Sequence, residues 1–290
     1  MKREITDTGT PQAAQPHSLR SGYLTSHVFR VTSTVSRFTS HVLRHLLLAW
    51  QFLTAIPLSR STHDAKPEEL AASMSWYPLV GCLLGGLLVM ADLFLAQVFS
   101  AEVTSLLLML LLIAITRGLH QDGLADMVDG LAGGRTAQAR LAIMRDGRVG
   151  AIGATGLFLA LGLRYAGLNE LPAGEHIALL IGMPVVGRWA MVMGAFHVTY
   201  ARSEGGLAQP FLVHLSWQHL CVATVTAGLV LTLLLGPWTL CCLLIGTALV
   251  RLSTAWFHRM FGGVTGDLLG ATNEIAEILF ILIVPVVLFR

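Results

Sequence analysis

The chain has 290 residues, of which 54% are hydrophobic and 12% charged, and its mean hydropathy is +0.68. This composition excludes an ordinary soluble domain and predicts several membrane spans. The net charge of +2 gives no basis for binding nucleic acid. The four cysteines, at 82, 221, 241 and 242, lie in apolar runs. Their spacing matches neither a disulfide framework nor a zinc site, so we expect buried packing residues.

Residues 1–42 are rich in Ser, Thr, Arg and His and contain no continuous apolar core. We therefore expect a flexible or interfacial N-terminal extension without a cleaved signal peptide. Residues 43–290 are expected to form one membrane-embedded domain. Its first apolar run, from Leu46 to Leu58, is short and is interrupted by Pro57. A run of this length predicts an interfacial or re-entrant helix rather than a span.

Seven further apolar runs follow, and we expect each to form a transmembrane helix. They cover about 76–98, 103–118, 151–168, 177–198, 219–235, 239–258 and 272–289. The fold class that this pattern predicts is all-α: a polytopic membrane bundle of about seven transmembrane helices plus the N-terminal interfacial or re-entrant helix. Glycines recur at close spacing in several runs, as at Gly81 and Gly85 or Gly150 and Gly153, which is typical of faces where helices pack closely.

The positive charges of the loops predict the orientation of the chain. The loops at 99–102, 169–176 and 236–238 contain no Lys or Arg, whereas those at 119–150, 199–218 and 259–271 contain four, one and one. Together with the basic N-terminal tail, this asymmetry predicts a multi-pass protein of the cell inner membrane with a cytoplasmic N-terminus. All the polar motifs described next then lie on the cytoplasmic side.

The most polar of these motifs begins at Arg117 and contains three acids, Asp122, Asp126 and Asp129. Their i, i+4, i+7 spacing puts the three carboxylates on one face of a helix, where they repel one another. A divalent cation would relieve that repulsion, and ligands that are all hard oxygen atoms suit Mg²⁺ or Mn²⁺. A solvated acidic helix is the alternative, but ionisable groups at membrane depth favour a functional site. His120 lies beside the acids and is a candidate base or substrate contact; the alternative is a histidine at the end of a span with no role.

A second polar motif precedes and enters the last apolar run. Asp267 follows a glycine-rich turn, and Glu274 and Glu277 lie within the apolar helix, where an unpaired charge would cost a few kcal/mol. Either these acids are neutral, or they share a cation, or they pair with an intramembrane arginine. The candidate arginines are Arg164, Arg188 and Arg251. A shared cation would make Asp267 and Glu274 further candidate metal ligands.

Arginines accompany the acids and complete the set of groups that phosphoryl transfer requires. Metal ions neutralise phosphate oxygens, and arginine binds them through two hydrogen bonds. The candidate substrate-binding residues are Arg117, Arg145, Arg148 and Arg202. The positive-inside bias alone would also put arginines in these loops. No Walker motif is present.

Three runs resemble the cobalamin synthase family, the adenosylcobinamide-GDP ribazoletransferases. They are 120–130 (HQDGLADMVDG), 143–150 (IMRDGRVG) and 263–271 (GVTGDLLGA), and shorter likenesses occur at 52–57, 77–81 and 200–202. The resemblance covers about residues 45 to 290. Gly147 stands where many members have Ser, and Gln121 where Leu is expected; both departures leave the acids intact.

The resemblance implies a membrane-embedded, Mg²⁺-dependent transferase domain acting late in cobalamin biosynthesis. Its substrates would be adenosylcobinamide-GDP and alpha-ribazole or alpha-ribazole 5'-phosphate, and its products adenosylcobalamin, or its 5'-phosphate, and GMP. Asp122, Asp126, Asp129 and Asp267 would hold the metal, and one of them or His120 would accept a proton. Arg145 and Arg148 would grip phosphate. Membrane lipid is an expected partner, and a homo-oligomer is left open.

Two alternatives remain from the residues. The run Asp126-Met127-Val128-Asp129-Gly130 is similar to the motif of CDP-alcohol phosphotransferases, but Gly133 and Gly134 stand where that family has Ala and Arg. A secondary transporter could also carry charged residues within its spans. It would be expected to contain an inverted repeat, which the order of the motifs does not suggest.

Overall fold

The computed structural model describes residues 39–58, 64–170 and 176–288. The chain divides into a unit of residues 1–44 and a unit of residues 45–290, and the description below concerns the second unit. The expectations for residues 1–38, the main part of the predicted N-terminal extension, lie outside the described residues.

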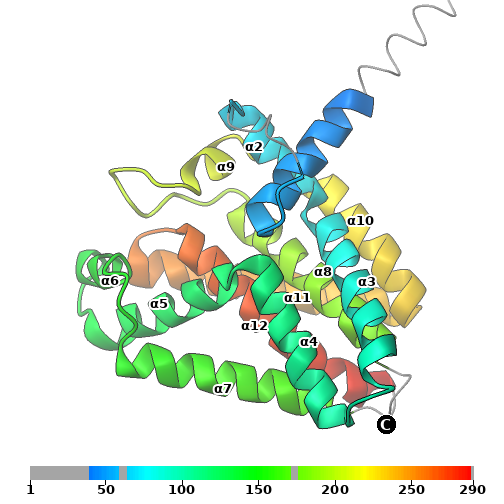
Figure 1. Cartoon of the computed structure of the whole chain (residues 1–290). Coiled ribbons are helices and arrows are strands. Elements are labelled where there is room, and N and C mark those ends of the chain that lie inside the picture. The colour runs from blue at the N-terminus through cyan, green and yellow to red at the C-terminus, as the bar shows by residue number, and fades with distance from the viewer. Residues whose placement is uncertain (1–38, 59–63, 171–175, 289–290) are drawn as a thin grey trace, which may run out of the picture. The chain divides into compact units, whose positions relative to one another are not determined.

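The described part of this unit is almost entirely helical, which confirms the all-α class (Figure 1). A first helix ends at Leu53. The helices that follow are α2 (Pro67–Ser73), the short 3₁₀ helix η1 (Met74–Trp76), α3 (Tyr77–Leu95), α4 (Ala101–Thr116), α5 (Leu119–Gly133), α6 (Ala137–Ile143), α7 (Ala151–Leu168), α8 (Ile177–Ala195), α9 (Gln209–Val213), α10 (Trp217–Leu235), α11 (Trp238–Phe261) and α12 (Gly266–Leu288).

Six helical segments among the described residues are long and apolar enough to cross a membrane: α2–α3, α7, α8, α10, α11 and α12. The remaining predicted span, at 103–118, corresponds to α4, which is only 16 residues long and continues into α5 after a bend of 90°. The bend explains why sequence hydropathy counts seven spans while length counts six. The apolar run 103–118 covers α4, whereas the three acids of α5 lie in the polar stretch that follows this run.

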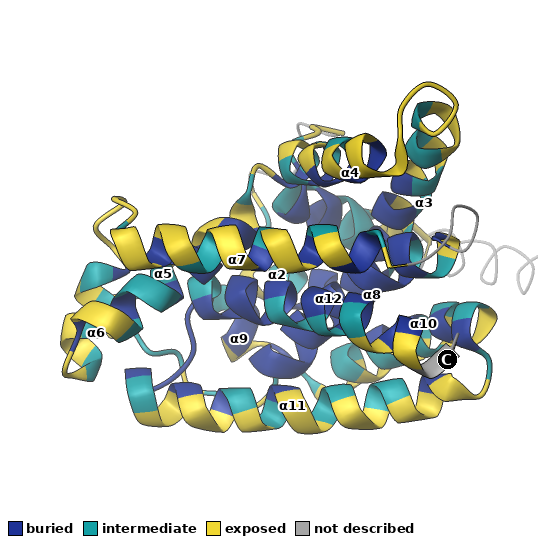
Figure 2. Cartoon of the chain, turned by 90° about the horizontal axis from the view of Figure 1, so that it is seen from below, coloured by how far each residue is buried: buried dark blue, intermediate teal, exposed yellow. Residues whose placement is uncertain are grey.

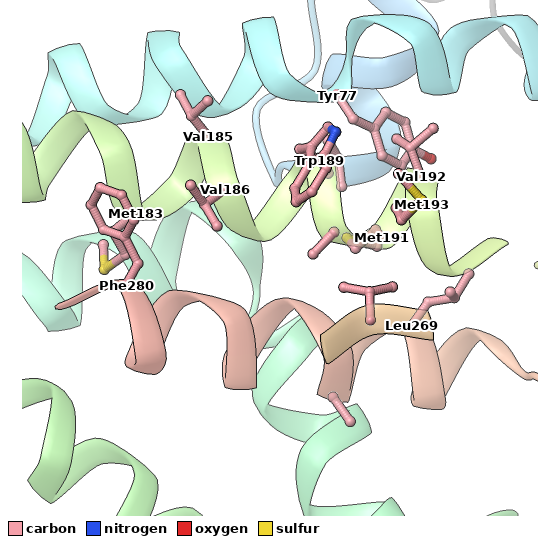
Figure 3. Close-up of a cluster of buried hydrophobic side chains, with 14 of the residues drawn as sticks. Tyr77, Met183, Val185, Val186, Trp189, Met191, Val192, Met193, Leu269 and Phe280 are labelled. Atoms are coloured by element: carbon pink, nitrogen blue, oxygen red, sulfur yellow. The ribbon is translucent and has the colours of Figure 1, made fainter. Parts of the chain in front are cut away.

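Helix α8 forms the centre of the bundle, and sixteen of its 19 residues are buried. Figure 3 shows its side chains packed between Tyr77 of α3 and Leu269 and Phe280 of α12. A Cβ atom at Gly81 would lie 2.4 Å from the carbonyl oxygen of Pro184, so the absence of a side chain there lets α3 approach α8 closely. The prediction that these glycines form a helix-packing face is confirmed for α3.

Helices α10 and α11 cover the outside of the bundle and expose most of their apolar side chains, as the yellow outer face of α11 shows in Figure 2. In a membrane such faces contact lipid. The expectation of buried cysteines is wrong here, because Cys221 and Cys241 are exposed on these two helices, while Cys82 and Cys242 are partly buried. Apolar runs do not distinguish core-facing from lipid-facing positions, since lipid is as apolar as the core.

Two local features bring distant parts of the sequence to the acidic helix α5. The loop after α8 pairs with the turn before α12 through an isolated bridge between Tyr200 and Val264. Helix α12 itself begins at Gly266, about six residues earlier than the apolar run at 272–289 predicts. Asp267 therefore lies in the first turn of α12 and not in a preceding loop. Helix α5 packs against α12, α7 and α6 (Figure 1).

Candidate active site

The three acids of the first motif lie on one helix, as their spacing predicts. Helix α5 buries His120, Gln121, Gly123 and Leu124 against its neighbours, whereas Asp122 is exposed and Asp126 and Asp129 are partly buried. Gly123 allows the close contact with α12, because a Cβ atom there would lie 2.5 Å from the carbonyl oxygen of Asp267. The acidic face of α5 and the first turn of α12 are thereby held side by side.

Asp129 has a specific structural partner in the beginning of α7. One carboxylate oxygen accepts the N–H of Gly150 and the other accepts that of Gly153, each at 2.7 Å. These are backbone donors that a helix leaves unpaired at its N-terminus. A Cβ atom at Gly153 would lie 2.2 Å from a carboxylate oxygen of Asp129, so glycine is needed there for the contact to form. Asp129 therefore fixes α7 against α5.

Asp126 lies where negative charge accumulates. Burial and the neighbouring carboxylates of Asp122 and Asp267 raise the pKa of Asp126 to about 7, although the guanidinium of Arg202 opposes the shift. A cation would lower this electrostatic cost by binding between the carboxylates. The charges of these residues act on one another although the residues come from three separate regions of the sequence.

The guanidinium of Arg202 donates a hydrogen bond to Asp267 at 2.6 Å, and both side chains are only partly exposed. The bridge between the two loops explains this contact, since Ala201 N–H donates to Val264 at 3.0 Å and Val264 N–H donates to Thr199 at 2.9 Å. Thr265 also donates to Asp267, at 3.5 Å. Arg202, a candidate from sequence alone, is thus brought to the acids of α5 and α12.

The other candidate arginines lie around this centre. Arg145 pairs with Glu204, and both line a hollow of about 520 Å³ together with Arg202. Arg148 is exposed and pairs with Asp146 at 2.6 Å. Arg117, at the bend between α4 and α5, donates to the carbonyl oxygen of Ala55 at 3.2 Å. Both Arg117 and Asp122 line a separate cavity of about 560 Å³.

Glu274 and Glu277 do not join the acids of α5. Arg164 of α7 donates to both glutamates, at 2.8 and 2.6 Å, and Arg188 of α8 also donates to Glu277. Gln121 of α5 donates to Glu274 at 3.0 Å. We call Gln121, Arg164, Arg188, Glu274 and Glu277 the buried ionic network. Pairing with intramembrane arginines, the alternative that the sequence left open, is therefore what the structure shows.

This pairing corrects the expectation that Glu274 is a metal ligand, because both of its carboxylate oxygens are engaged and its side chain is 1% exposed. Arg251, the third candidate partner, instead donates to the carbonyl oxygen of Phe196 at 3.0 Å. His120 is also 1% exposed, and burial, Arg188 and Arg164 keep its pKa well below the usual value. Its Nε2 atom has no hydrogen-bond partner among the described residues.

The donor chemistry of the acidic centre fits a hard divalent cation, although the side chains do not form a finished cage. Among the described residues, no three His, Cys, Asp or Glu side chains are arranged to hold a metal ion. Asp122, Asp126 and Asp267 nevertheless supply oxygen atoms of the kind that Mg²⁺ prefers, and burial together with their mutual repulsion raises the pKa of Asp126. Mg²⁺ usually keeps several water ligands and binds through one or two carboxylates plus phosphate.

The sequence did not predict the contacts of four residues in this arrangement. The spacing of Gly150 and Gly153 predicts a helix-packing face. It does not indicate their contact with the carboxylate of Asp129, which lies more than twenty residues earlier in the sequence. Gln121 read only as a departure from a family pattern. Glu204 carried no assignment, and its contact with Arg145 spans 59 residues. The feature of the sequence that could have indicated a role for Glu204 is its position two residues after Arg202 in a polar loop.

Fold and site together define a polytopic helical membrane protein with an acidic, arginine-flanked centre at one end of its bundle. The sequence profile of the cobalamin-5-phosphate synthase family matches residues 45–285, and the chain belongs to this family. It is accordingly a transferase of cobalamin synthesis.

Curated relatives carry the same assignment. An adenosylcobinamide-GDP ribazoletransferase of Syntrophobacter fumaroxidans is 41% identical over 243 residues, which is 82% of this chain and 96% of the relative. One from Chlorobaculum tepidum is 38% identical over 240 residues, covering 81% and 92%. One from Clostridium acetobutylicum is 30% identical over 249 residues, covering 85% and 97%. No solved structure matches the chain.

Proposed function

We propose that this chain joins adenosylcobinamide-GDP to alpha-ribazole, or to its 5'-phosphate, and releases GMP. The observation that carries the proposal is the meeting of Asp126, Asp267 and Arg202, which come from α5, the start of α12 and the loop after α8. Carboxylates beside a guanidinium suit a reaction on a pyrophosphate. The names of the relatives supply the identity of the substrates.

Mg²⁺ is the cation that we propose for the acidic centre. Asp122, Asp126 and Asp267 would hold it, and it would neutralise charge on the pyrophosphate. Arg202 and Arg145 bind phosphate oxygens directly, and their present partners, Asp267 and Glu204, keep the guanidinium groups in place before substrate arrives. Asp129 contributes through α7, because its oxygens already accept two backbone N–H groups.

The proposed reaction exchanges the phosphoanhydride bond of the pyrophosphate for a phosphoester bond. The 3'-hydroxyl oxygen of alpha-ribazole forms a bond to the phosphorus atom that carries cobinamide, and the bond from that phosphorus to the oxygen of GMP breaks. GMP leaves with the bonding electron pair. The hydroxyl proton passes to a carboxylate of α5, which acts as the general base.

We also propose that the acidic centre lies on the cytoplasmic side of the inner membrane. The support is the distribution of positive charge, since Arg145, Arg148 and Arg202 belong to loops on one side while the opposite loops contain no Lys or Arg. Water-soluble nucleotide substrates would then reach the acids without crossing the bilayer.

The test is release of GMP by the purified full-length chain in lipid, with adenosylcobinamide-GDP, alpha-ribazole and Mg²⁺. We expect Mg²⁺-dependent release by the wild type and a loss of at least about 100-fold in Asp126→Asn, the usual scale for a group that acts in acid–base catalysis. Asp92→Asn, the same change on α3 away from the centre, is expected to retain activity. No GMP from a well-folded wild type would refute the proposal, and CDP-activated alcohols would then be tried.

A further inference from the structure

A cavity of about 560 Å³ lies beside the acidic helix, on the side of the bend between α4 and α5. This volume is in the range of roughly 300–1,000 Å³ that is typical of small-molecule sites. Asp122 lines the cavity, whereas Asp126, Asp267 and Arg202 do not. The cavity therefore adjoins the acidic centre without coinciding with it. The other lining side chains used below are Phe52, Thr54, Thr116, Arg117, Val149 and Leu157.

The bend that shapes the cavity is conformationally unusual. Arg117 and Gly118 both have left-handed backbone conformations, with φ of 56° and 66°. A non-glycine residue in this region costs of order 1–3 kcal/mol and is found preferentially at functional sites. The conformation turns the chain by 90° and brings Arg117 and Asp122 to the same cavity wall. Ala55 reinforces the bend, since its N–H donates to Ile115 at 2.6 Å and its carbonyl accepts from Arg117.

Both apolar and polar residues line the cavity. Phe52, Val149 and Leu157 supply apolar surface, whereas Thr54, Arg117 and Asp122 supply hydrogen-bonding groups. The ring of Phe52 is held in place by Tyr77, with ring centroids 6.1 Å apart, and by Phe211, at 4.7 Å. A fixed aromatic ring in a cavity that also contains hydrogen-bonding side chains is complementary to a ligand with a flat apolar ring system at one end and hydroxyl groups at the other.

We propose that this cavity binds the nucleoside acceptor, an aromatic base joined to ribose, with the base against Phe52 and the sugar toward Asp122. The inference rests on the proposed function, in which the two substrates are alpha-ribazole and adenosylcobinamide-GDP, and it assigns the first of them to the cavity. It assigns the acceptor to a specific part of the chain, formed by residues 51–54, the α4–α5 bend and the beginning of α7.

Size and charge exclude the other substrate from this cavity. A corrin ring is much larger than the ligands that such a volume encloses. The pyrophosphate of the GDP group carries several negative charges, whereas Arg117 is the only basic residue among the described residues that line the cavity, and the same lining contains the acid Asp122. The hollow lined by Arg145 and Arg202 offers two guanidinium groups instead. The acid face of α5 leads from the cavity, at Asp122, to Asp267 and Arg202 near Asp126.

The test fills the cavity from an exposed position. Val149 is 55% exposed and precedes α7, so Val149→Trp adds bulk to the cavity wall without disturbing the core. The matched control is Ile152→Trp, because Ile152 is 56% exposed and does not line the cavity. With Val149→Trp we expect KM for alpha-ribazole to rise about tenfold or more, the equivalent of about 1.4 kcal/mol of binding. We expect KM for adenosylcobinamide-GDP to stay within about twofold in both variants.

A second measurement does not depend on turnover. Calorimetric titration of alpha-ribazole into the wild type in lipid nanodiscs is expected to show binding that Phe52→Leu and Val149→Trp weaken and Ile152→Trp does not. The proposal is overturned if Val149→Trp changes KM for adenosylcobinamide-GDP instead, or changes neither KM while the protein remains folded. Absence of GMP release by the wild type would refute the proposed function, whereas release with unaltered acceptor binding in both cavity variants would refute only the assignment of the cavity.

Discussion

At the scale of single residues, the acids of α5 differ in what they do although they look alike in the sequence. Asp122 is exposed at a cavity, Asp126 is crowded by other carboxylates, and Asp129 accepts two backbone N–H groups. A carboxylate that accepts backbone N–H groups at a helix N-terminus is also stabilised by the helix dipole. Asp129 is thus a positioning residue whose effect reaches the acidic centre through α7.

Gly153→Ala tests this role of Asp129. The new Cβ atom would lie 2.2 Å from the Asp129 carboxylate, so the side chain must move and lose a hydrogen bond. Overpacking of this kind costs about 1–3 kcal/mol, and we expect a lower Tm in lipid together with slower GMP release. Gly162→Ala on the same helix is the control, because a Cβ atom there meets nothing within 4 Å. Equal Tm changes in the two variants would contradict the role of Asp129.

Sequence reasoning predicted the shared helical face of these acids, because the i, i+4, i+7 spacing is a property of the chain itself. It could not predict that Asp129 contacts Gly150 and Gly153, since this contact depends on how α7 packs on α5. Glu274 shows the same limit. Its spacing from Asp267 suggested a common ligand set, but its orientation within the bundle directs it to Arg164.

At the scale of helices, the buried ionic network joins four elements that hold the centre. Arg164 of α7 and Arg188 of α8 each donate to Glu277 of α12, and Gln121 of α5 donates to Glu274. Two arginines and two glutamates balance in charge, which a low-dielectric interior requires. Gly187 leaves room for this arrangement, because a Cβ atom there would lie 2.8 Å from a carboxylate oxygen of Glu277. The network therefore fixes α12, and with it Asp267, relative to α5.

Glu277→Gln should be among the most destabilising single changes in the chain. It leaves the buried guanidinium groups of Arg164 and Arg188 with one carboxylate between them, and breaking a buried pair in this way costs about 3–5 kcal/mol. We expect a large fall in Tm, measured by thermal unfolding in lipid. Glu204→Gln breaks an exposed pair with Arg145 and is expected to leave Tm nearly unchanged. A similar Tm for the two variants would argue against the network.

Hydropathy predicted α3, α7, α8, α10 and α11 within a few residues, because long apolar runs reveal membrane helices directly. It could not predict the break after α4, which depends on left-handed conformations at Arg117 and Gly118. It also could not identify α8 as the central helix, because the surface of a membrane helix is apolar both where it contacts lipid and where it contacts protein.

At the scale of the whole molecule, the asymmetry of positive charge predicts which side of the membrane each loop occupies. The test compares two serine-to-cysteine changes in a chain without its four native cysteines. Ser100→Cys lies in an exposed turn before α4, and Ser203→Cys lies in an exposed loop beside Arg202. A membrane-impermeant maleimide should label Ser100→Cys in intact cells, and Ser203→Cys only after the inner membrane is opened. The reverse pattern would invert the proposed orientation.

The buried ionic network also has a consequence for how the protein is made. The arginines lie on α7 and α8, whereas their glutamate partners lie on α12, which leaves the ribosome after both of them. Arg164 and Arg188 therefore enter the bilayer before any partner has been synthesised, at an insertion cost of roughly 2.5–3.5 kcal/mol for each arginine at a helix centre. Insertion of α12 relieves this cost, so we expect this helix to commit the newly inserted bundle to its mature arrangement.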